Sequence, residues 1–244
     1  EERASERVRV VGERVDNRCL LLGGGVLGGR SEFSSEDLFT GFPVLYLSYG
    51  QFYIDTAELG YYLLGDESRG GYWGLAALLE LPADGFEVGD ERHLVDLDDR
   101  DPTLEGGLKL IAGGGWGNIE LGANADLQGE HDGYSVRASY DFPLRFDTLT
   151  VSPGVFVTYR DEDNGDYYYG VDADEIGADR PAFEVNEPTL GTGVGYSLSY
   201  RLGTDWSLFH SLQIRMLDDL LDGSPLTVTG EASTLGVGVL YRVW

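Results

Sequence analysis

Three histidines, one cysteine and many carboxylates are the side chains of this chain that could do nucleophilic, acid–base or metal chemistry. The histidines begin the sequences HLV, HDG and HSL at positions 93, 131 and 210. Only His210 stands beside a hydroxyl, that of Ser211, and adjacent residues of a strand point to opposite faces. A nucleophile and its base must lie within hydrogen-bonding reach of one another. We therefore expect no enzyme and no catalytic residue.

The carboxylates gather in acidic segments, and divalent cations are the ligands that such segments could bind. Asp161 to Asp166 has some features of a calcium loop. The EF-hand pattern, however, places glycine sixth and glutamate twelfth, whereas here Gly165 is fifth and Asp172 is twelfth. A second acidic segment contains Asp96, Asp98, Asp99 and Asp101. We expect solvated loops and no cofactor, with Ca²⁺ or Mg²⁺ that bridges to lipopolysaccharide as the alternative.

Charge and apolar content exclude two classes of protein. The 244 residues include 43 Asp and Glu against 17 Lys and Arg, a net charge of −26. Nucleic acid is excluded as a partner because phosphate binding needs a positive surface. The longest uncharged apolar run, residues 19–29, is shorter than the roughly 20 residues of a spanning helix, so a helical membrane protein is excluded. Residues 1–18 lack an apolar core, so we interpret them as a mature start after a removed signal peptide.

Alternation of apolar and polar residues is the strongest structural signal. Within 116–128, Ile119, Leu121 and Leu127 share one face, and Glu120 and Asp126 share the other. Residues 133–146, 205–217 and 232–244 show the same period of two, which indicates strands. Cys19 falls in another expected strand, 19–29, and we expect it to pack there as a small apolar residue. The chain is therefore predicted to be all-β.

A soluble barrel and a transmembrane barrel share this alternation, and three features favour the membrane. The expected strands have about 9 to 12 residues, and about 9 to 11 tilted residues cross a bilayer. Aromatic residues stand near strand ends, where an interfacial girdle belongs. Charged residues also occupy the middle of the polar faces, as in a lumen. The lumen-lining candidates are Glu120, Asp126, Arg137, Asp141, Gln213 and Arg215. We expect opposed charges among them to pair and plug the lumen, with conduction as the alternative.

The connections alternate between short and long, which orients the barrel. Tight turns are expected near 113–115, 146–147 and 202–204, and long acidic connections at 83–102, 161–188 and 218–231. Short turns belong on the periplasmic side and long loops outside the cell. Residues 1–18 then form a charged periplasmic segment, and 19–244 form the barrel. Residues 51–64 must supply one strand or two; we predict an antiparallel up-and-down barrel of twelve strands, with ten as the alternative.

Three consecutive tyrosines, Tyr167, Tyr168 and Tyr169, lie within the second long connection. Tyrosine offers rigid amphipathic contact area at low entropic cost. The cluster could fold the loop onto the mouth of the barrel or contact a partner. We name the three residues as candidates for an extracellular contact.

Several short motifs resemble those of the MipA/OmpV family of outer-membrane proteins. They are YYYGV at 167–171 followed by RPAF at 180–183, HLVDLDDR at 93–100, LDD to DGSP across 217–225, and GVLYR at 238–242. These motifs follow the order of the family from about residue 19 to the end. Each motif alone is weakly specific, but their order and spacing together make the resemblance specific.

The resemblance implies a non-enzymatic outer-membrane scaffold of a Gram-negative bacterium. Proteins of this family are described as linking a lytic murein transglycosylase to a murein synthase, and others as surface antigens or adhesins. The implied partners are therefore these two murein enzymes, beside the lipid and lipopolysaccharide of the membrane. A narrow cation-biased pore is the alternative function, and a soluble barrel with an apolar ligand is a third. The segment 1–18 is the most accessible periplasmic docking site for a partner.

Overall fold

The computed structural model describes residues 18–68, 70–82, 94–95, 97, 100, 102–178 and 180–244. Within them, alternating segments form strands because each buries one face and exposes the other. The first strands are β1 (Arg18–Arg30), β2 (Leu38–Tyr49), β3 (Phe52–Asp55), β4 (Glu58–Ser68), β5 (Gly71–Glu80) and β6 (Glu105–Gly114). The others are β7 (Gly117–Asp126), β8 (Tyr134–Asp141), β9 (Leu144–Phe146), β10 (Leu149–Arg160), β11 (Thr189–Leu202), β12 (Trp206–Met216) and β13 (Glu231–Arg242).

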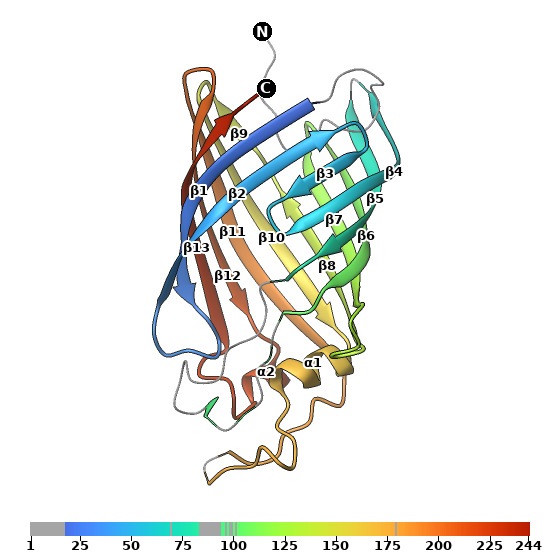
Figure 1. Ribbon diagram of the computed structural model, residues 1–244, viewed down its shortest axis with the longest axis vertical. Coiled ribbons are helices and arrows are strands. Elements are labelled where there is room, and N and C mark those ends of the chain that lie inside the picture. The colour runs from blue at the N-terminus through green and yellow to red at the C-terminus, as the bar shows by residue number, and fades with distance from the viewer. Residues whose placement is uncertain are drawn as a thin grey trace.

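These strands close into one antiparallel barrel (Figure 1). Neighbours in sequence pair with one another, and β1 closes the ring by pairing with β13 as well as with β2. Strands β8 and β9 both pair with β10, so they are two halves of one wall strand interrupted at Phe142-Pro143. The wall therefore has twelve strands, as predicted.

The segment that the sequence left ambiguous, 51–64, supplies two strands. β3 has only four residues and ends in a tight hairpin to β4. Thr56 at its tip has φ of 53°, a left-handed conformation that is unusual for a β-branched residue. With two strands here the count is even, and the alternative of ten strands is wrong.

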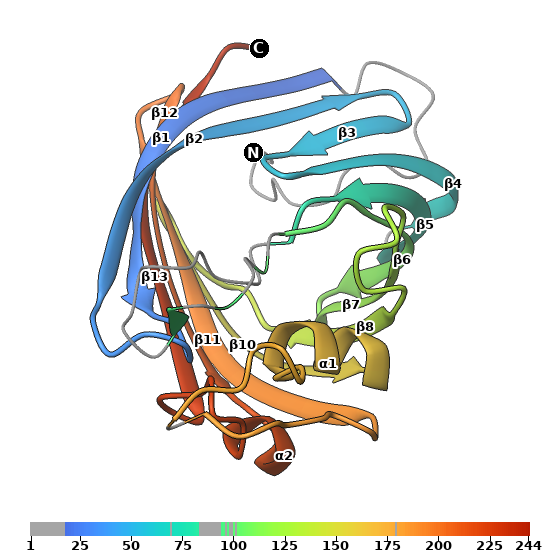
Figure 2. The ribbon, with the colours of Figure 1, turned by 60° about the horizontal axis from the view of Figure 1, so that its bottom comes forward.

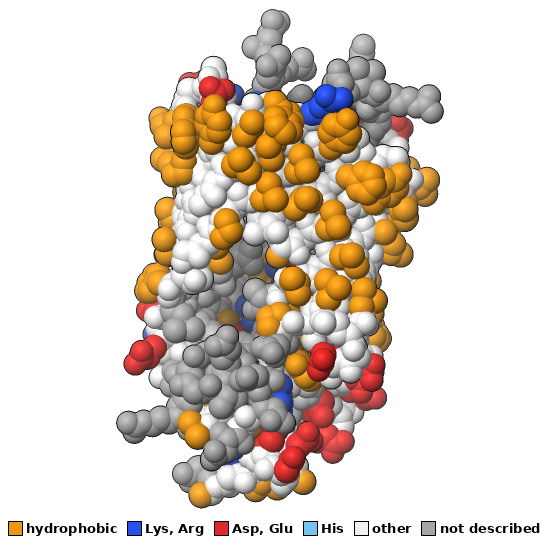
Figure 3. Space-filling model, viewed as in Figure 1, with side chains coloured by type: hydrophobic (Ala, Val, Ile, Leu, Met, Phe, Trp, Pro, Cys, Tyr) orange, Lys and Arg blue, Asp and Glu red, His pale blue; other side chains and the backbone are white. Residues whose placement is uncertain are grey.

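Apolar side chains cover the outside of the wall. Ile119 and Leu121 of β7 are 45% and 43% exposed, as the alternation predicted for the lipid-facing side. In the space-filling view, hydrophobic side chains spread over the wall, and Asp and Glu gather mainly below it (Figure 3). Neither helix among the described residues is long and apolar enough to cross a bilayer.

The two ends of the barrel differ. The end that we call the turn end carries the short turns at Gly50, Gly115, Asp147 and Gly203, together with the start of β1 and the C-terminus (Figure 1). Gly203 has φ of 76°, which glycine adopts without steric cost. The opposite end, the loop end, carries α1 (Glu162–Tyr169) and α2 (Asp219–Asp222). This separation agrees with the predicted alternation of short and long connections.

The loop end contains a well-buried apolar cluster of described residues, which we call the loop cap. It joins segments that are far apart in sequence, and Figure 2 shows the loops gathered across the mouth of the ring of strands. Its buried members are Phe33, Leu94, Leu97, Tyr168, Tyr169, Val171, Val185, Leu221 and Leu226. The barrel wall thus faces lipid, and the conventional hydrophobic core lies in its loops.

Candidate functional site

One wall of the lumen carries a charged cluster built by β3 to β7. Lys109 of β6 is the only lysine of the chain. Its ammonium group contacts the carboxylate of Glu58 and lies 3.7 Å from that of Glu120. The Tyr53 hydroxyl also donates to Glu58. Nearby, the Asn124 side chain donates to Glu80 over 2.8 Å. Carboxylates thus outnumber cations on this side of the lumen.

Arginines gather on the opposite wall, built by β8 to β13. Their strand neighbours point outward and are exposed, such as Tyr140, Val155, Ile214 and Tyr241, so the arginines lie on the inner face. They are Arg137, Arg160, Arg201, Arg215 and Arg242. The guanidinium of Arg137 stacks on the Phe156 ring, 3.7 Å from its centroid. Arginines therefore predominate on this wall, which also carries Asp141, and carboxylates predominate on the other, which also carries Lys109.

The six predicted lumen residues all lie on the inner face, but they do not form one site. Glu120 pairs with Lys109, and the Asn118 side chain donates to Asp141 over 2.8 Å. Arg215 reaches Glu32 in the connection after β1. Gln213 lies on the same face as Arg215, on the alternate residues of β12. Some opposed charges pair as predicted, whereas whether the lumen conducts stays a prediction.

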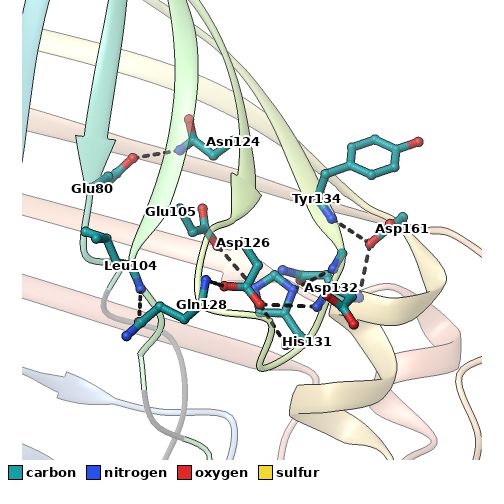
Figure 4. Close-up of polar contacts among 12 residues, drawn as sticks. Glu80, Leu104, Glu105, Asn124, Asp126, Gln128, His131, Asp132, Tyr134 and Asp161 are labelled. Carbon is teal, nitrogen blue, oxygen red and sulfur yellow. Dashed lines mark hydrogen bonds and ion pairs between the residues drawn. The ribbon is translucent and has the colours of Figure 1, made fainter.

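Asp126 holds a turn at the loop end rather than a solute (Figure 4). Its carboxylate accepts hydrogen bonds from the backbone N–H groups of Gln128, His131 and Asp132. The His131 ring is buried; Nδ1 accepts from the Gly133 N–H, and Nε2 lies 3.6 Å from Glu105. Since Nδ1 is an acceptor, Nε2 carries the proton. The role of Asp126 in this turn was not predicted, because the HDG motif by itself indicates only a local turn.

Two residues of the tyrosine cluster pack the loop down, which is the first of the two roles that the sequence left open; a partner contact by the cluster stays a prediction. Tyr168 and Tyr169 are each only 2% exposed, because their rings fill the loop cap. The Tyr169 hydroxyl donates to Glu32 over 2.6 Å, and the Tyr169 ring packs against Phe33 at 5.1 Å. Only Tyr167 is half-buried, beside the ring of His131. In this arrangement Tyr167 is the most accessible of the three side chains.

A buried ion pair stabilises the loop that follows α1. Arg100 Nη2 donates to both carboxylate oxygens of Glu175, at 2.7 and 2.8 Å. The pair borders a cavity of about 240 Å³ that Asp166, Tyr167 and Asp172 also line. Burial raises the pKa of Asp166, and the carboxylates of Asp172 and Glu184 add to the increase.

The acidic run at 161–166 forms a helix and not a calcium loop. The side chain of Asp161 caps α1 by accepting from the Asn164 N–H over 3.0 Å. Glu162 and Asp163 follow in the first turn, where the helix dipole favours negative charge. No group of three or more metal-ligating side chains occurs in the part of the chain that the structure describes. All four residues of the second acidic segment, Asp96, Asp98, Asp99 and Asp101, lie outside that part. Divalent cations, like lipopolysaccharide, remain predictions.

His210 and Ser211 point to opposite faces of β12, as predicted. The His210 ring stacks on Tyr196, 5.5 Å between centroids and 16° between planes. Ser211 faces the lumen beside Gly236. These two side chains cannot act as base and nucleophile on one substrate.

Comparisons with known proteins agree with this architecture. The model of the family "MltA-interacting protein MipA" matches residues 22–243. The MltA-interacting protein of Escherichia coli K12 is 26% identical over 230 residues, which cover 91% of this chain and 89% of that protein. Outer membrane protein OmpV of Vibrio cholerae is 22% identical over 219 residues, covering 89% and 84%. With this match across nearly all of its barrel, the chain belongs to the MipA family of outer-membrane β-barrel proteins.

Proposed function

We propose that this protein is a non-enzymatic scaffold that ties a murein transglycosylase to the outer membrane. The observation that carries the proposal is the alignment with the MltA-interacting protein, which spans nine-tenths of each chain. The name of that relative states an interaction, and the resemblance noted in the sequence implies a murein enzyme as the partner. The separation of His210 from Ser211 agrees with a role in binding rather than catalysis.

We place the docking surface at the turn end. The predicted orientation of the barrel puts this end in the periplasm, where murein lies. Its exposed polar residues include Gln51, Asp147 and Asp205. Residues 1–17 of the predicted charged segment 1–18 lie outside the described residues, but β1 begins at the turn end with Arg18, so their attachment point is there. The loop cap stands at the opposite end and would leave this surface free.

The test is chemical crosslinking in intact cells, followed by detergent extraction and identification of the proteins that copurify. The turn-end variant carries Gln51→Arg and Asp205→Arg, and a second variant lacks residues 1–17. Glu162→Arg with Asp174→Arg, exposed at the loop end, is the matched control. We expect a murein transglycosylase with the wild type and the control, and less of it with one or both turn-end variants. Recovery of lipopolysaccharide alone from the wild type would contradict the scaffold and favour a pore or a surface antigen.

The separated charges of the lumen favour a narrow pore as the second candidate. Acidic and basic walls that face each other create a transverse field, which orients dipolar solutes and ions as they pass. Acidic loops at the entrance would bias such a pore toward cations. Purified protein in planar bilayers should then show discrete conductance steps. Arg137→Gln, which removes one positive charge from the basic wall, should increase cation selectivity. Absence of conductance at any applied voltage would exclude this function.

A further inference from the structure

The outer face of the barrel wall carries very few positive charges. On β1 the outward positions are the even-numbered ones, since Leu22 and Val26 are 45% and 50% exposed. Arg18 and Arg30 share this parity, so they point outward from the two ends of the strand. In the other described strands, each lysine or arginine has the parity of the inner face. The two ends of β1 thus supply the only cations on the membrane-facing side of the described strands.

Arg30 is paired with a carboxylate, whereas Arg18 is not. At the loop end, Arg30 Nε lies 3.4 Å from the Asp37 carboxylate. At the turn end, the guanidinium of Arg18 contacts only Tyr49 among the described residues. Its Cζ lies 4.9 Å from the ring centroid, and Nη2 donates to the hydroxyl over 3.2 Å. A guanidinium carries several further N–H donors, so an anion outside the protein can accept from those of Arg18.

Tyr49 holds this charge at the surface. Arg18 and Tyr49 are opposite one another in the register of β1 and β2, and both side chains are exposed. The ring supports the planar guanidinium, and a guanidinium in a fixed orientation suits a bidentate contact with phosphate. In the space-filling view, a Lys or Arg side chain borders the hydrophobic surface at the end where β1 begins (Figure 3). Arg18 is therefore both accessible and oriented.

Aromatic side chains mark the level of the membrane interface on both sides of Arg18. Toward β13, Trp206 and Tyr241 are 50% and 39% exposed, with 4.9 Å between their ring centroids. Toward β3, the rings of Phe52 and Tyr61 pack edge-on at 4.7 Å. Exposed aromatic rings at the end of a membrane barrel belong where the hydrocarbon meets the headgroups. Arg18 therefore lies at the depth of the lipid headgroups.

The outer face next to Arg18 is apolar. Away from the turn end, the next outward pairs of β1 and β2 are Leu20↔Leu47 and Leu22↔Leu45. A lipid whose phosphate contacts Arg18 would lay its acyl chains on these leucines, where no charged side chain has to be desolvated. The cation and the leucines together match the two parts of a phospholipid.

We propose that Arg18, held by Tyr49, binds the phosphate of an anionic phospholipid at the turn end. Charge complementarity selects this occupant. The chain as a whole carries a net charge of −26, so an anion is attracted to the outer surface only where a cation lacks a partner. A zwitterionic headgroup is selected less, because its own cation offsets the attraction. The loop end has no equivalent on β1, because Asp37 is already paired with Arg30. This lipid site is independent of the scaffold role and of conduction.

Native mass spectrometry of the full chain tests the proposal. Folded protein is released from micelles that contain equal amounts of phosphatidylglycerol and phosphatidylcholine with the same acyl chains. The ratio of the two lipids on protein that retains one lipid is then measured. We expect the wild type to favour phosphatidylglycerol about fivefold, as one cation near a membrane surface would produce. Arg18→Gln should lose most of this preference. Arg30→Gln, on the same face of the same strand, is the matched control and should keep it.

An equal preference in Arg18→Gln and the wild type would overturn the proposal, as would a wild type without a preference. A variant that lacks residues 1–17 separates the site from the segment that precedes it. If the preference is lost in this variant but kept in Arg18→Gln, the segment binds the lipid and Arg18 does not. Tyr49→Phe keeps the ring but removes the hydroxyl that accepts from Arg18, and should reduce the preference by less than Arg18→Gln does. Only protein with the electrophoretic mobility of the folded barrel is analysed.

Discussion

At the scale of single residues, burial decides how much an ion pair contributes. The side chains of Arg100 and Glu175 are only 10% and 6% exposed, whereas those of Arg30 and Asp37 are 51% and 56% exposed. A buried pair becomes costly when one charge is removed, since the other is left without compensation. An exposed pair is solvated with or without its partner.

We therefore expect Glu175→Gln to destabilise the loop cap by about 3 kcal/mol, because it removes the buried negative charge that accepts both hydrogen bonds from Arg100 Nη2. Asp37→Asn, the matched control, should cost less than about 1 kcal/mol. The destabilisation caused by each substitution is measured in detergent micelles, from the rate of protease cleavage within residues 170–188 as a function of urea concentration. Equal effects of the two substitutions would show that the Arg100–Glu175 pair is solvated.

At the scale of elements, the alternating period predicted the strands and their faces well. Cys19, Glu120 and Arg215 all lie in strands where the pattern placed them. The differences have local causes. The segment 133–146, for example, is broken at Phe142-Pro143 because proline cannot donate to the ladder.

The loop cap could not be predicted from the same signals. Its members come from four connections, and each connection alone is short of apolar residues and rich in carboxylates. Phe33 and Leu221 meet the tyrosines of α1 only after the barrel has closed. The charge pattern also gave a wrong prediction at α1. The acidic run predicts a solvated loop, but it forms a helix whose N-cap is Asp161.

The tyrosines of α1 should therefore stabilise the cap through packing. Tyr168→Ala is expected to cost about 3 kcal/mol or more, since it opens a cavity in an otherwise filled cluster. Ile176→Ala, at a side chain that is 52% exposed in the same loop, should cost far less. Amide hydrogen exchange across residues 162–171 reports the difference. Unchanged protection in the Tyr168 variant would mean that the cap does not depend on this core.

The stability of the cap should also depend on pH through Asp166. Burial raises the pKa of this carboxyl above its ordinary value of 3.8. A raised folded-state pKa means that the folded cap binds the proton more tightly than the unfolded loop does. The contribution of the group is then fully present below the ordinary value and is lost as pH rises through the folded pKa.

We expect the protection factors of amides in the cap, which are the intrinsic exchange rates divided by the observed rates at the same pH, to rise on acidification from neutral pH toward that range. Asp166→Asn should remove this dependence while its side-chain oxygen still accepts from the Val185 N–H, an interaction of 2.7 Å in the wild type. Asp163→Asn, on the exposed side of the same helix, controls for the loss of helix charge. An identical pH profile in wild type and Asp166→Asn would assign the dependence to other groups.

At the scale of the whole molecule, the barrel is turned inside out relative to a soluble protein, and this follows from the medium around it. Large apolar side chains such as Leu121 stay exposed on the outside because lipid covers them, while Glu120, one residue earlier, faces the lumen. An introduced arginine should therefore be much more costly on the outer face than on the inner face of one strand pair.

Leu121→Arg places a charge on the lipid-facing side of β7 and should destabilise the barrel in bilayers by about 2 to 4 kcal/mol if the position lies near the midplane. Ser139→Arg, on the inner face of β8 and opposite Glu120 in the register, should cost little because a carboxylate is adjacent. Guanidinium titration of folding into phosphatidylcholine vesicles, followed by the mobility shift of the folded barrel, compares them. If Ser139→Arg were the more damaging of the two, the assignment of outer and inner faces would be reversed. The expected asymmetry tests the membrane orientation of the wall directly, without a partner, a ligand or knowledge of whether the lumen conducts.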